Sequence, residues 1–446
     1  MTRALHVVRP GEGDSAPGAA APLAPLAPIG VLDSGVRFAL VGSELSAGAA
    51  RQHLGDHVRV FGARPSAVGS HGAELLDAIT TIGLTGRGGG HFPLARKWRT
   101  ALAAGGGGTV VVNGAESESC SAKDAALLQL RPHLVLDGAV SAAETMAARS
   151  VVVWLHDGAS TTRLSVEQAL AERREAGVVD PPIVVRSGPA HYLTGESSAV
   201  VQALSGGPAL PAFRRVPSAV SGVDGRPTLV SNVETFARTA LAARTGVAAY
   251  RPATLVTVVG RRDRLVLDVP PSATFDDLVG IEWSREHGVP AAALLGGYGG
   301  TWVTWSQIGG LPVHEPALRA EGHTLGPGIV VPLPAGACGL AETARIVDYL
   351  ASSSARQCGP CMFGLRAVAD LVGQLAEGSA RRSDLARLRR FAGEVDGRGG
   401  CSHPDGAVRL VTTALHTFSA DVRQHVHRHR CLHARTAPVV PVPSGA

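Results

Sequence analysis

The sequence predicts an α/β fold followed by two smaller units, a β-grasp sheet and a helical bundle. Apolar strand-like runs alternate with helical runs over residues 31–250, which indicates a largely parallel sheet. Short strands dominate residues 251–333, and only helical periodicity is seen in residues 334–432. A chain of 446 residues is long enough for these domains to have cores of their own.

The two ends of the chain, 1–30 and 433–446, are rich in Ala and Pro and are expected to be disordered tails. Prolines interrupt the apolar runs, so neither a signal peptide nor a membrane span is expected. The net charge is +5, but the arginines are dispersed and form no dense run with aromatics, which argues against nucleic acid as a partner. Six irregularly spaced cysteines indicate no disulfide framework and favour a cytoplasmic location.

Lysine and asparagine are so rare that their positions are informative. Lys97 and Lys123 are the only lysines among 42 basic residues, and Asn113 and Asn232 are the only asparagines. The planar guanidinium of Arg does not replace a compact ammonium at every site. We therefore expect these four residues to make contacts that a substitute would lose.

The first distinctive motif is the loop GLTGRGGGHFP, in which the glycines of Gly86–Gly90 surround Arg87. Glycines let the backbone approach a phosphate, and neighbouring N–H groups hold an anion at the start of a helix. The spacing fits neither a Walker A loop nor the Rossmann fingerprint, so a plain flexible loop is the alternative. The nearby cation Lys97 favours a ligand that carries phosphate.

A second motif, NGAESES, follows the buried strand that ends at Asn113. Ligands of open α/β sheets bind at the carboxyl ends of the strands. Asn113 offers a donor and an acceptor to a polar ring, and Glu116 and Glu118 offer acceptors to ribose or ribityl hydroxyls. The alternative is a capping segment in which Ser119 or Ser121 starts the next helix.

Two weaker motifs also precede helices. One contains Tyr192, Gly195 and Glu196, and the other contains Asn232 and Glu234. A carboxylate ahead of a helix is more often a cap than part of a binding site.

The helical region holds Cys358 and Cys361 in a C-x-x-C motif, and Cys401 follows later. Such a motif is compatible with a redox dithiol, a zinc site or an iron–sulfur site. No strand precedes it, which argues against a thioredoxin-like dithiol. Zinc with His403 as a fourth ligand stays open, but a thiolate-held cluster fits better beside a flavin-type site upstream.

Taken together, the motifs resemble those of the FMN- and NADH-binding iron–sulfur subunit of NADH:quinone oxidoreductase and its diaphorase-type relatives in hydrogenases and formate dehydrogenases. The resemblance covers about residues 70–420 and follows the order GRGGxGFPxxxKW, NxxExExxxxKD, YxxGE, NVET, a β-grasp (SLBB-like) domain and CxPC. It implies FMN and one 4Fe–4S cluster as cofactors, and NAD(P)H as substrate. It further implies a ferredoxin-like or other redox partner in a hetero-oligomer, and no catalytic nucleophile.

The resemblance also implies site residues. Around FMN it places Gly86, Arg87, Gly88, Gly89, Gly90, Lys97, Asn113, Tyr192, Gly195, Glu196, Asn232 and Thr235. On the nicotinamide side it places Phe92, Glu116 and Glu118. As metal ligands it implies Cys358, Cys361 and Cys401, with His403 near them. Residues 31–250 would then bind FMN, and residues 334–432 would bind the cluster.

The nucleotide site departs from the family pattern. Ala115 replaces an acidic residue, Ser197 a Glu and Ser231 an Asn, and Thr100 stands where an aromatic residue is expected to stack on adenine. FMN binding is therefore expected to be better preserved than NADH binding. One alternative is a paralogue that keeps FMN and the cluster but accepts electrons from another protein.

The cluster motif departs as well, because Ala355 stands at the position of its first cysteine. Cys338 is not expected to replace it, since a helix over 340–352 would be roughly 20 Å long and would hold the two positions apart. A cluster with three cysteines and a His or non-protein ligand is one possibility. A non-catalytic scaffold that holds zinc is the other alternative.

Overall fold

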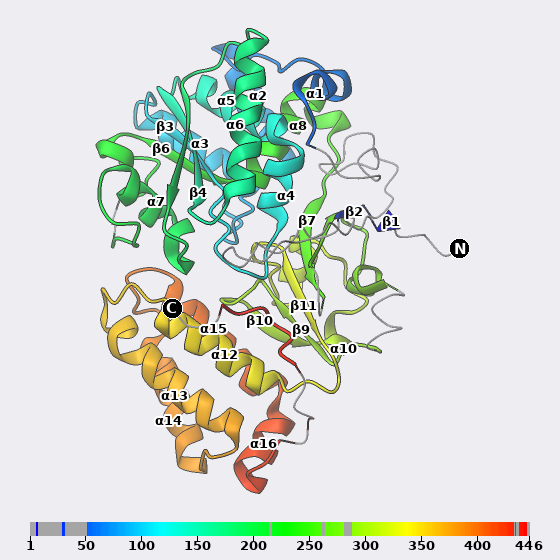
Figure 1. The fold of residues 1–446 in the computed structure, drawn as a ribbon, viewed down its shortest axis with the longest axis vertical. Helices are drawn as coiled ribbons and strands as arrows, with labels where there is room; N and C mark the ends of the chain where they lie inside the picture. Colours follow the sequence, from blue (N-terminus) through cyan, green and yellow to red (C-terminus); the bar gives the residue numbers. More distant parts are fainter. Residues whose placement is uncertain are drawn as a thin grey trace, which may run out of the picture.

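The computed structural model describes residues 6–7, 29–31, 51–213, 216–260, 264–280, 288–431, 433 and 437–443. Figure 1 shows three parts: the α/β domain at the top, a mixed sheet below it on the right, and a helical bundle below it on the left. The predicted fold class is thus confirmed. Most of the expected tail 1–30 lies outside the described residues, apart from the strands β1 (His6–Val7) and β2 (Ile29–Val31).

The α/β domain is built on a parallel sheet whose strands lie in the order β5-β4-β3-β6. The strands are β3 (Thr109–Asn113), β4 (Ser150–His156), β5 (Ile183–Gly188) and β6 (Thr228–Asn232). The helices are α1 (Leu54–Phe61), α2 (Ser70–Ile82), α3 (Leu94–Ala103), α4 (Lys123–Leu130), α5 (Pro132–Thr145), α6 (Ser160–Glu175), α7 (Ser197–Leu204) and α8 (Val233–Ala249). The continuous apolar runs of β3 and β4 reflect a sheet that is covered on both faces.

The chain reverses its direction of travel across this sheet at β3. From β3 it passes to β4 and β5 on one side, and it then returns to place β6 on the other side. The boundary between β3 and β6 is therefore a topological switch point, where open α/β sheets bind ligands at the carboxyl ends of their strands. Asn113 and Asn232 end these two strands and are register partners.

The second sheet has the strand order β1-β2-β8-β7-β11-β9-β10. Its strands are β7 (Thr254–Val259), β8 (Arg264–Val269), β9 (Ala292–Leu295), β10 (Thr301–Thr304) and β11 (Ile329–Leu333), with the short helices α10 (Trp305–Ile308) and α11 (Glu315–Ala320). Two antiparallel hairpins flank β11, which runs parallel to β7. This arrangement is that of a β-grasp sheet.

The bundle contains α12 (Gly339–Ser352), the π-helical turn η4 (Pro360–Gly364), α13 (Leu365–Glu377), α14 (Arg382–Val395), α15 (His403–Thr417) and α16 (Ser419–Arg428). The sequence predicts one continuous helix where α15 and α16 are found. The break falls at Phe418, whose backbone leaves the helical region. Its buried ring packs edge-on against Trp302 and lies over Gly339, where a Cβ would overlap it. A tertiary contact thus ends the helix.

The C-terminal residues 437–443 are packed against the protein, although the sequence predicts a disordered tail from 433. Val440 is 0% exposed, and its N–H donates to the Glu342 carboxylate at 3.1 Å. The carbonyl of Pro441 accepts a hydrogen bond from the Tyr298 hydroxyl. The prolines that suggested disorder are compatible with an extended segment whose polar groups find partners in other domains.

Candidate functional site

The glycine-rich loop between α2 and α3 lies over the start of α8. It is closed by a hydrogen bond from the Gly86 N–H to the Phe92 carbonyl at 2.9 Å. The Arg87 N–H donates to Thr235 Oγ1 at 2.9 Å. A Cβ at Gly88 would lie 3.5 Å from the Asn232 Cβ, whereas one at Gly90 would have no neighbour within 4 Å. The loop is therefore anchored at the switch point and open beside Gly90.

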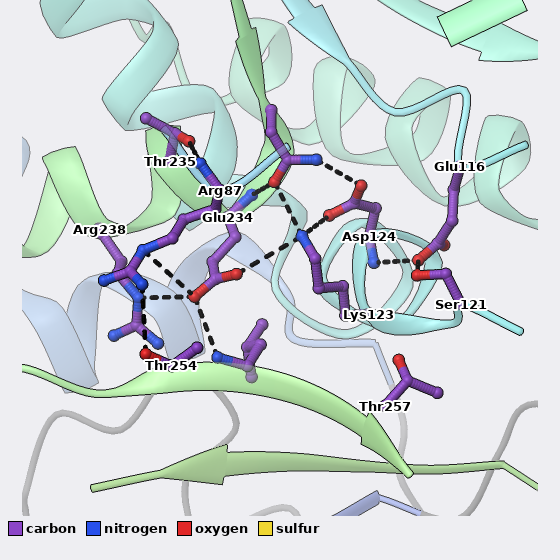
Figure 2. A network of polar contacts seen from close by, with 12 residues as sticks. Arg87, Glu116, Ser121, Lys123, Asp124, Glu234, Thr235, Arg238, Thr254 and Thr257 are labelled. Atoms are coloured by element: carbon purple, nitrogen blue, oxygen red, sulfur yellow. Dashed lines mark hydrogen bonds and ion pairs between the residues drawn. The ribbon is translucent and has the colours of Figure 1, made fainter. Parts of the chain in front are cut away.

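The Arg87 side chain points into the protein and not towards the open side of the loop. Its guanidinium donates to Thr254 Oγ1 at 3.2 Å and lies 4.0 Å from the Glu234 carboxylate (Figure 2). Burial lowers the pKa of Arg87, and Glu234 opposes that effect. The expected contribution of Arg87 to a ligand site would thus come from its backbone and not from its charge.

Lys123 and Asn232, two of the four rare residues, meet in a buried polar network. The Lys123 ammonium donates to the Asp124 carboxylate at 2.8 Å and to Asn232 Oδ1 at 2.9 Å, and it lies 3.4 Å from Glu234. Asn232 Nδ2 donates back to Asp124 at 2.5 Å, and its Oδ1 accepts the N–H of Glu234, which caps α8. A compact ammonium with three donors fits this space, and a planar fork does not.

The same network joins the α/β domain to the β-grasp sheet. Glu234 accepts hydrogen bonds from Arg238 at 2.8 Å and from the N–H of Leu255 on β7 at 3.0 Å. Arg238 also donates to Asp268 at 3.0 Å. Burial alone raises the pKa of Glu234, but Arg238 and Lys123 outweigh it and bring the pKa to about 2. Figure 2 shows these side chains converging between α8 and the β7 strand.

The other two rare residues lie beside the strand ends: Asn113 ends β3, Lys97 contacts β6, and both are partly exposed. Lys97 Nζ donates to the Val230 carbonyl at 2.8 Å, and burial lowers its pKa. Asn113 Nδ2 donates to the Gly195 carbonyl at 2.7 Å. Ser231, the residue before the end of β6, has a buried Oγ with no hydrogen-bond partner among the described residues. An unsatisfied buried hydroxyl at a strand end indicates a place for a polar ligand.

The Glu116 carboxylate, expected on the nicotinamide side, is a helix cap in this structure. It accepts hydrogen bonds from the N–H groups of Asp124 and Ala125 at 2.9 and 2.7 Å and from Ser121 Oγ at 2.5 Å. The segment therefore caps the start of α4, as the alternative interpretation predicts. The cap is the Glu116 carboxylate, and neither Ser119 nor Ser121 accepts these N–H groups. Glu196 likewise caps α7 through the N–H groups of Ser198 and Ala199.

Glu118 is partly buried and contacts residues of the α/β domain and of the β-grasp sheet. It accepts the Tyr298 N–H at 2.8 Å and the Tyr192 hydroxyl at 3.4 Å. Burial raises the pKa of Glu118 to about 7. The Tyr192 ring, which was expected in the FMN pocket, lies 6.0 Å from that of Tyr298 and 5.4 Å from that of His403. These contacts between the domains could not be read from the sequence, and the nucleotide- and FMN-binding roles of Glu118 and Tyr192 stay predictions.

Two further residues flank the loop. Phe92 is 44% exposed, and its ring lies 5.6 Å from the Arg96 guanidinium. His91 occupies the position of the last glycine in the pattern GRGGxGFP and has a positive φ of 45°. Its Nε2 pairs with the Gly326 carbonyl at 2.8 Å and lies 3.3 Å from Glu315. Sequence reasoning missed His91, although its departure from the pattern was a visible signal.

The three cysteines of the predicted cluster site lie near one another. Cys361 is in η4 and Cys358 lies two residues before it. A Cβ at Gly400 would lie 3.9 Å from the Cys358 Cβ, which brings Cys401 close. Burial and the neighbouring thiols of Cys358 and Cys401 raise the pKa of Cys361 to about 12. These thiols do not appear among the groups of three or more ligand atoms within 4.8 Å of one another in the described part of the chain.

His403 is held apart from this trio in its present rotamer. Its Nε2 pairs with the Leu350 carbonyl at 2.9 Å, and its Nδ1 is buried without a partner among the described residues. Three neighbouring thiols that are too widely spaced as a group for the 4.8 Å limit fit a multinuclear cluster better than a single ion. Cys338 lies at the opposite end of α12 from Cys358, as the helix-length argument predicts.

Two family models match the chain. The model described as the Nuo51 FMN-binding domain matches residues 79–240, and the NADH-ubiquinone oxidoreductase-F iron-sulfur binding region matches residues 341–425. Together they cover more than half of the chain and keep the predicted order of the two sites. Fold and site thus define an oxidoreductase subunit with FMN and 4Fe–4S as its cofactors.

The relatives make this class more specific. The chain is 26% identical to the second F-type NADH-quinone oxidoreductase subunit of Rhizobium meliloti (strain 1021), an alignment covering 80% of this chain and 90% of the relative. It is also 26% identical to the F-type NADH-quinone oxidoreductase subunit of Escherichia coli (strain K12), covering 80% of this chain and 85% of that protein. The chain is similar to these F-type NADH-quinone oxidoreductase subunits, and the resemblance predicted from the sequence is confirmed.

A solved structure supports the fold independently. The chain aligns with an NAD+-reducing NiFe hydrogenase in the H2-reduced state with a TM-score of 0.72 and 24% identity, over 80% of this chain. The alignment spans only 63% of that hydrogenase chain. Among the described helices of the present protein, none is long and apolar enough to cross a membrane.

Proposed function

We propose that this protein passes electrons from NAD(P)H, through FMN bound at the β3–β6 switch point, to an iron–sulfur cluster in the bundle. The observation that carries the proposal is the register pairing of Asn113 with Asn232 beneath the glycine loop. The comparisons support an F-type subunit of an NADH dehydrogenase. The particular residues and domain limits are part of the proposal.

The residues at the switch point fit FMN. The loop backbone at Gly88–Gly90 has no side chains to obstruct a phosphate, and the N-terminus of α8 adds a positive dipole end. Ser231 Oγ has no partner among the described residues. The Lys97 ammonium has three N–H donors, and among the described residues one of them is used, in the bond to the Val230 carbonyl. We propose that Lys97 and Ser231 face the flavin, while Asn232 and Thr235 hold the loop and helix in place.

The chemistry that FMN supplies when bound is exchange between the two-electron hydride of NAD(P)H and single electrons. The protein's part is binding and electrostatics. Desolvation strengthens the field of Lys97, and that cation stabilises negative charge on the phosphate or on the reduced ring. Phe92, exposed beside the loop, would lie on the nicotinamide side.

We propose Cys358, Cys361 and Cys401 as protein ligands of the 4Fe–4S cluster. His403 would have to turn its unpartnered Nδ1 to the cluster, or give up its Leu350 hydrogen bond, to become the fourth ligand. A non-protein ligand at the position left by Ala355 is the alternative that the geometry favours.

An exposed apolar pair lies directly beside the proposed cluster. Met362 and Phe363, which follow Cys361, are 54% and 72% exposed. Exposed apolar groups beside a redox centre fit a docking site for a redox protein. We propose a ferredoxin-like or quinone-reductase partner in a hetero-oligomer. A cytoplasmic location, the remaining expectation, is tested by cell fractionation.

A second candidate function is an FMN and iron–sulfur paralogue that takes electrons from another protein. Two contacts favour it: Glu116 accepts helix N–H groups as a cap, and Glu118 is bonded between the domains. Neither carboxylate is then free to bind a nucleotide. The substitutions at Ala115 and Thr100 point the same way.

The test begins with an anaerobic absorption spectrum and FMN, iron and zinc assays on one sample. Flavin and several irons per chain are expected. Stopped-flow mixing with NADH then separates the two candidates, since rapid flavin bleaching contradicts the paralogue. A colourless protein with zinc alone would overturn both.

A further inference from the structure

A second group of metal-ligand side chains lies at the far end of the bundle. Cys338 precedes α12, His425 is on α16, and Cys431 follows α16. Their ligand atoms all lie within 4.8 Å of one another, and Cys338 Sγ is 3.9 Å from His425 Nε2. These residues come from three segments of the chain, so their convergence is a property of the tertiary structure.

The imidazole of His425 is oriented for a ligand on one side only. Its Nδ1 lies 2.9 Å from the Leu375 carbonyl, and the ring is 1% exposed. A carbonyl oxygen only accepts, so Nδ1 carries the proton and the Nε2 lone pair faces Cys338. Metal-binding histidines are commonly held in this way, with the second ring nitrogen bonded to a backbone carbonyl.

The spacing suits one small divalent ion. Zinc binds sulfur at about 2.3 Å and imidazole nitrogen at about 2.0–2.1 Å, so a tetrahedral site separates the two ligand atoms by about 3.6 Å. The observed separation of Cys338 Sγ and His425 Nε2 is 3.9 Å, a few tenths of an ångström longer. Thiolate and imidazole ligands together favour zinc over calcium or magnesium.

We propose that Cys338, His425 and Cys431 form a zinc site that is separate from the iron–sulfur centre. Cys338 comes directly before the 14-residue α12, and Cys358 comes after it. At 1.5 Å per residue this helix is about 20 Å long. No fourth His, Cys, Asp or Glu joins the group within the described residues, so water completes the coordination. The zinc and the cluster are therefore distinct in position and ligands.

The position of the site indicates what the ion stabilises. Cys431 lies a few residues before the segment 437–443, whose Val439 and Val440 N–H groups bond to Glu342 on α12. Cys120 and Tyr298, from the other two domains, contact Pro441 in this segment. A metal that holds Cys431 to the start of α12 would keep this inter-domain segment in place.

The test measures zinc and iron per chain in protein purified anaerobically under reducing conditions. Wild type is expected to contain about one zinc, as a single site requires. Cys431→Ser is expected to lose the zinc and keep the iron. Cys431 is exposed, so this change leaves the core intact. The matched control, Cys361→Ser, is expected to lose iron and keep zinc.

Cobalt binding adds a measurement that does not depend on the metal acquired in cells. Titration of metal-free wild type with Co²⁺ should give the thiolate-to-metal absorption and strong visible bands of a tetrahedral site, and Cys338→Ser should weaken both. Three results would overturn the proposal: no zinc or cobalt bound to wild type, zinc lost only from Cys361→Ser, or a Cys338–Cys431 disulfide in the reduced preparation. Each of these leaves the proposed electron-transfer function untouched.

Discussion

Replacing Glu118 by Gln should stabilise the protein at neutral pH and have little effect in acid. Glu118 is partly buried between two domains, and this burial raises its pKa from 4.5 to about 7. Gln keeps the shape, its oxygen accepts the Tyr298 N–H, and its amide donates to the Tyr192 hydroxyl. A shift from 4.5 to about 7 corresponds to about 3 kcal/mol of folding free energy.

The sign of the pH dependence follows from linkage. Below pH 4.5 both the folded and the unfolded state hold the proton, so Glu118 carries no penalty. Between pH 4.5 and about 7 unfolding releases that proton, and stability falls as the pH rises through the folded pKa. Above that range the folded state contains a buried charge and the full penalty applies. The variant should therefore gain about 3 kcal/mol at pH 8 and almost nothing at pH 4.5.

Urea unfolding of wild type and Glu118→Gln at several pH values measures this difference. Glu116→Gln is the matched control, because it changes a carboxylate two residues away that caps α4. The control should lose about 1 kcal/mol from its weakened cap and show no gain that grows with pH. A Glu118→Gln variant whose difference from wild type is the same at pH 4.5 and pH 8 would refute the reasoning.

Four further changes test other parts of the structure. Lys123→Ala removes the cation shared by two buried carboxylates and should cost about 3–5 kcal/mol, seen as a lower urea midpoint; an unchanged midpoint would contradict the network. Cys361→Ser should lower iron while FMN, assayed after acid release, stays constant, and iron at the wild-type level would exclude this thiol as a ligand. Gly297→Ala should destabilise, since φ is +75° and a Cβ there would overlap Glu118. Gly393→Ala, in α14 with nothing near its Cβ, should stabilise by about 0.5–1 kcal/mol in the same unfolding assay.

The scarcity of lysine and asparagine predicts which residues matter but not which contacts they make. All four rare residues lie at or beside the switch point. Composition did not show that Lys123 and Asn232 belong to a buried network that joins two domains, while Lys97 and Asn113 donate to backbone carbonyls at the strand ends. That division depends on which distant segments pack against each side chain, and a single rare residue carries no such signal.

The sequence by itself determined the order of the domains, the glycine loop and the C-x-x-C motif. It also determined that Cys338 is far from that motif. Periodicity and helix length act over a few turns, so these features could be predicted without a fold. Only the tertiary structure decided the contacts of Glu116 and Glu118, the break at Phe418 and the packing of the C-terminal segment. The same holds for the meeting of Cys338, His425 and Cys431. Each of these depends on contacts between segments far apart in the chain, whose geometry is fixed only when the domain cores are packed.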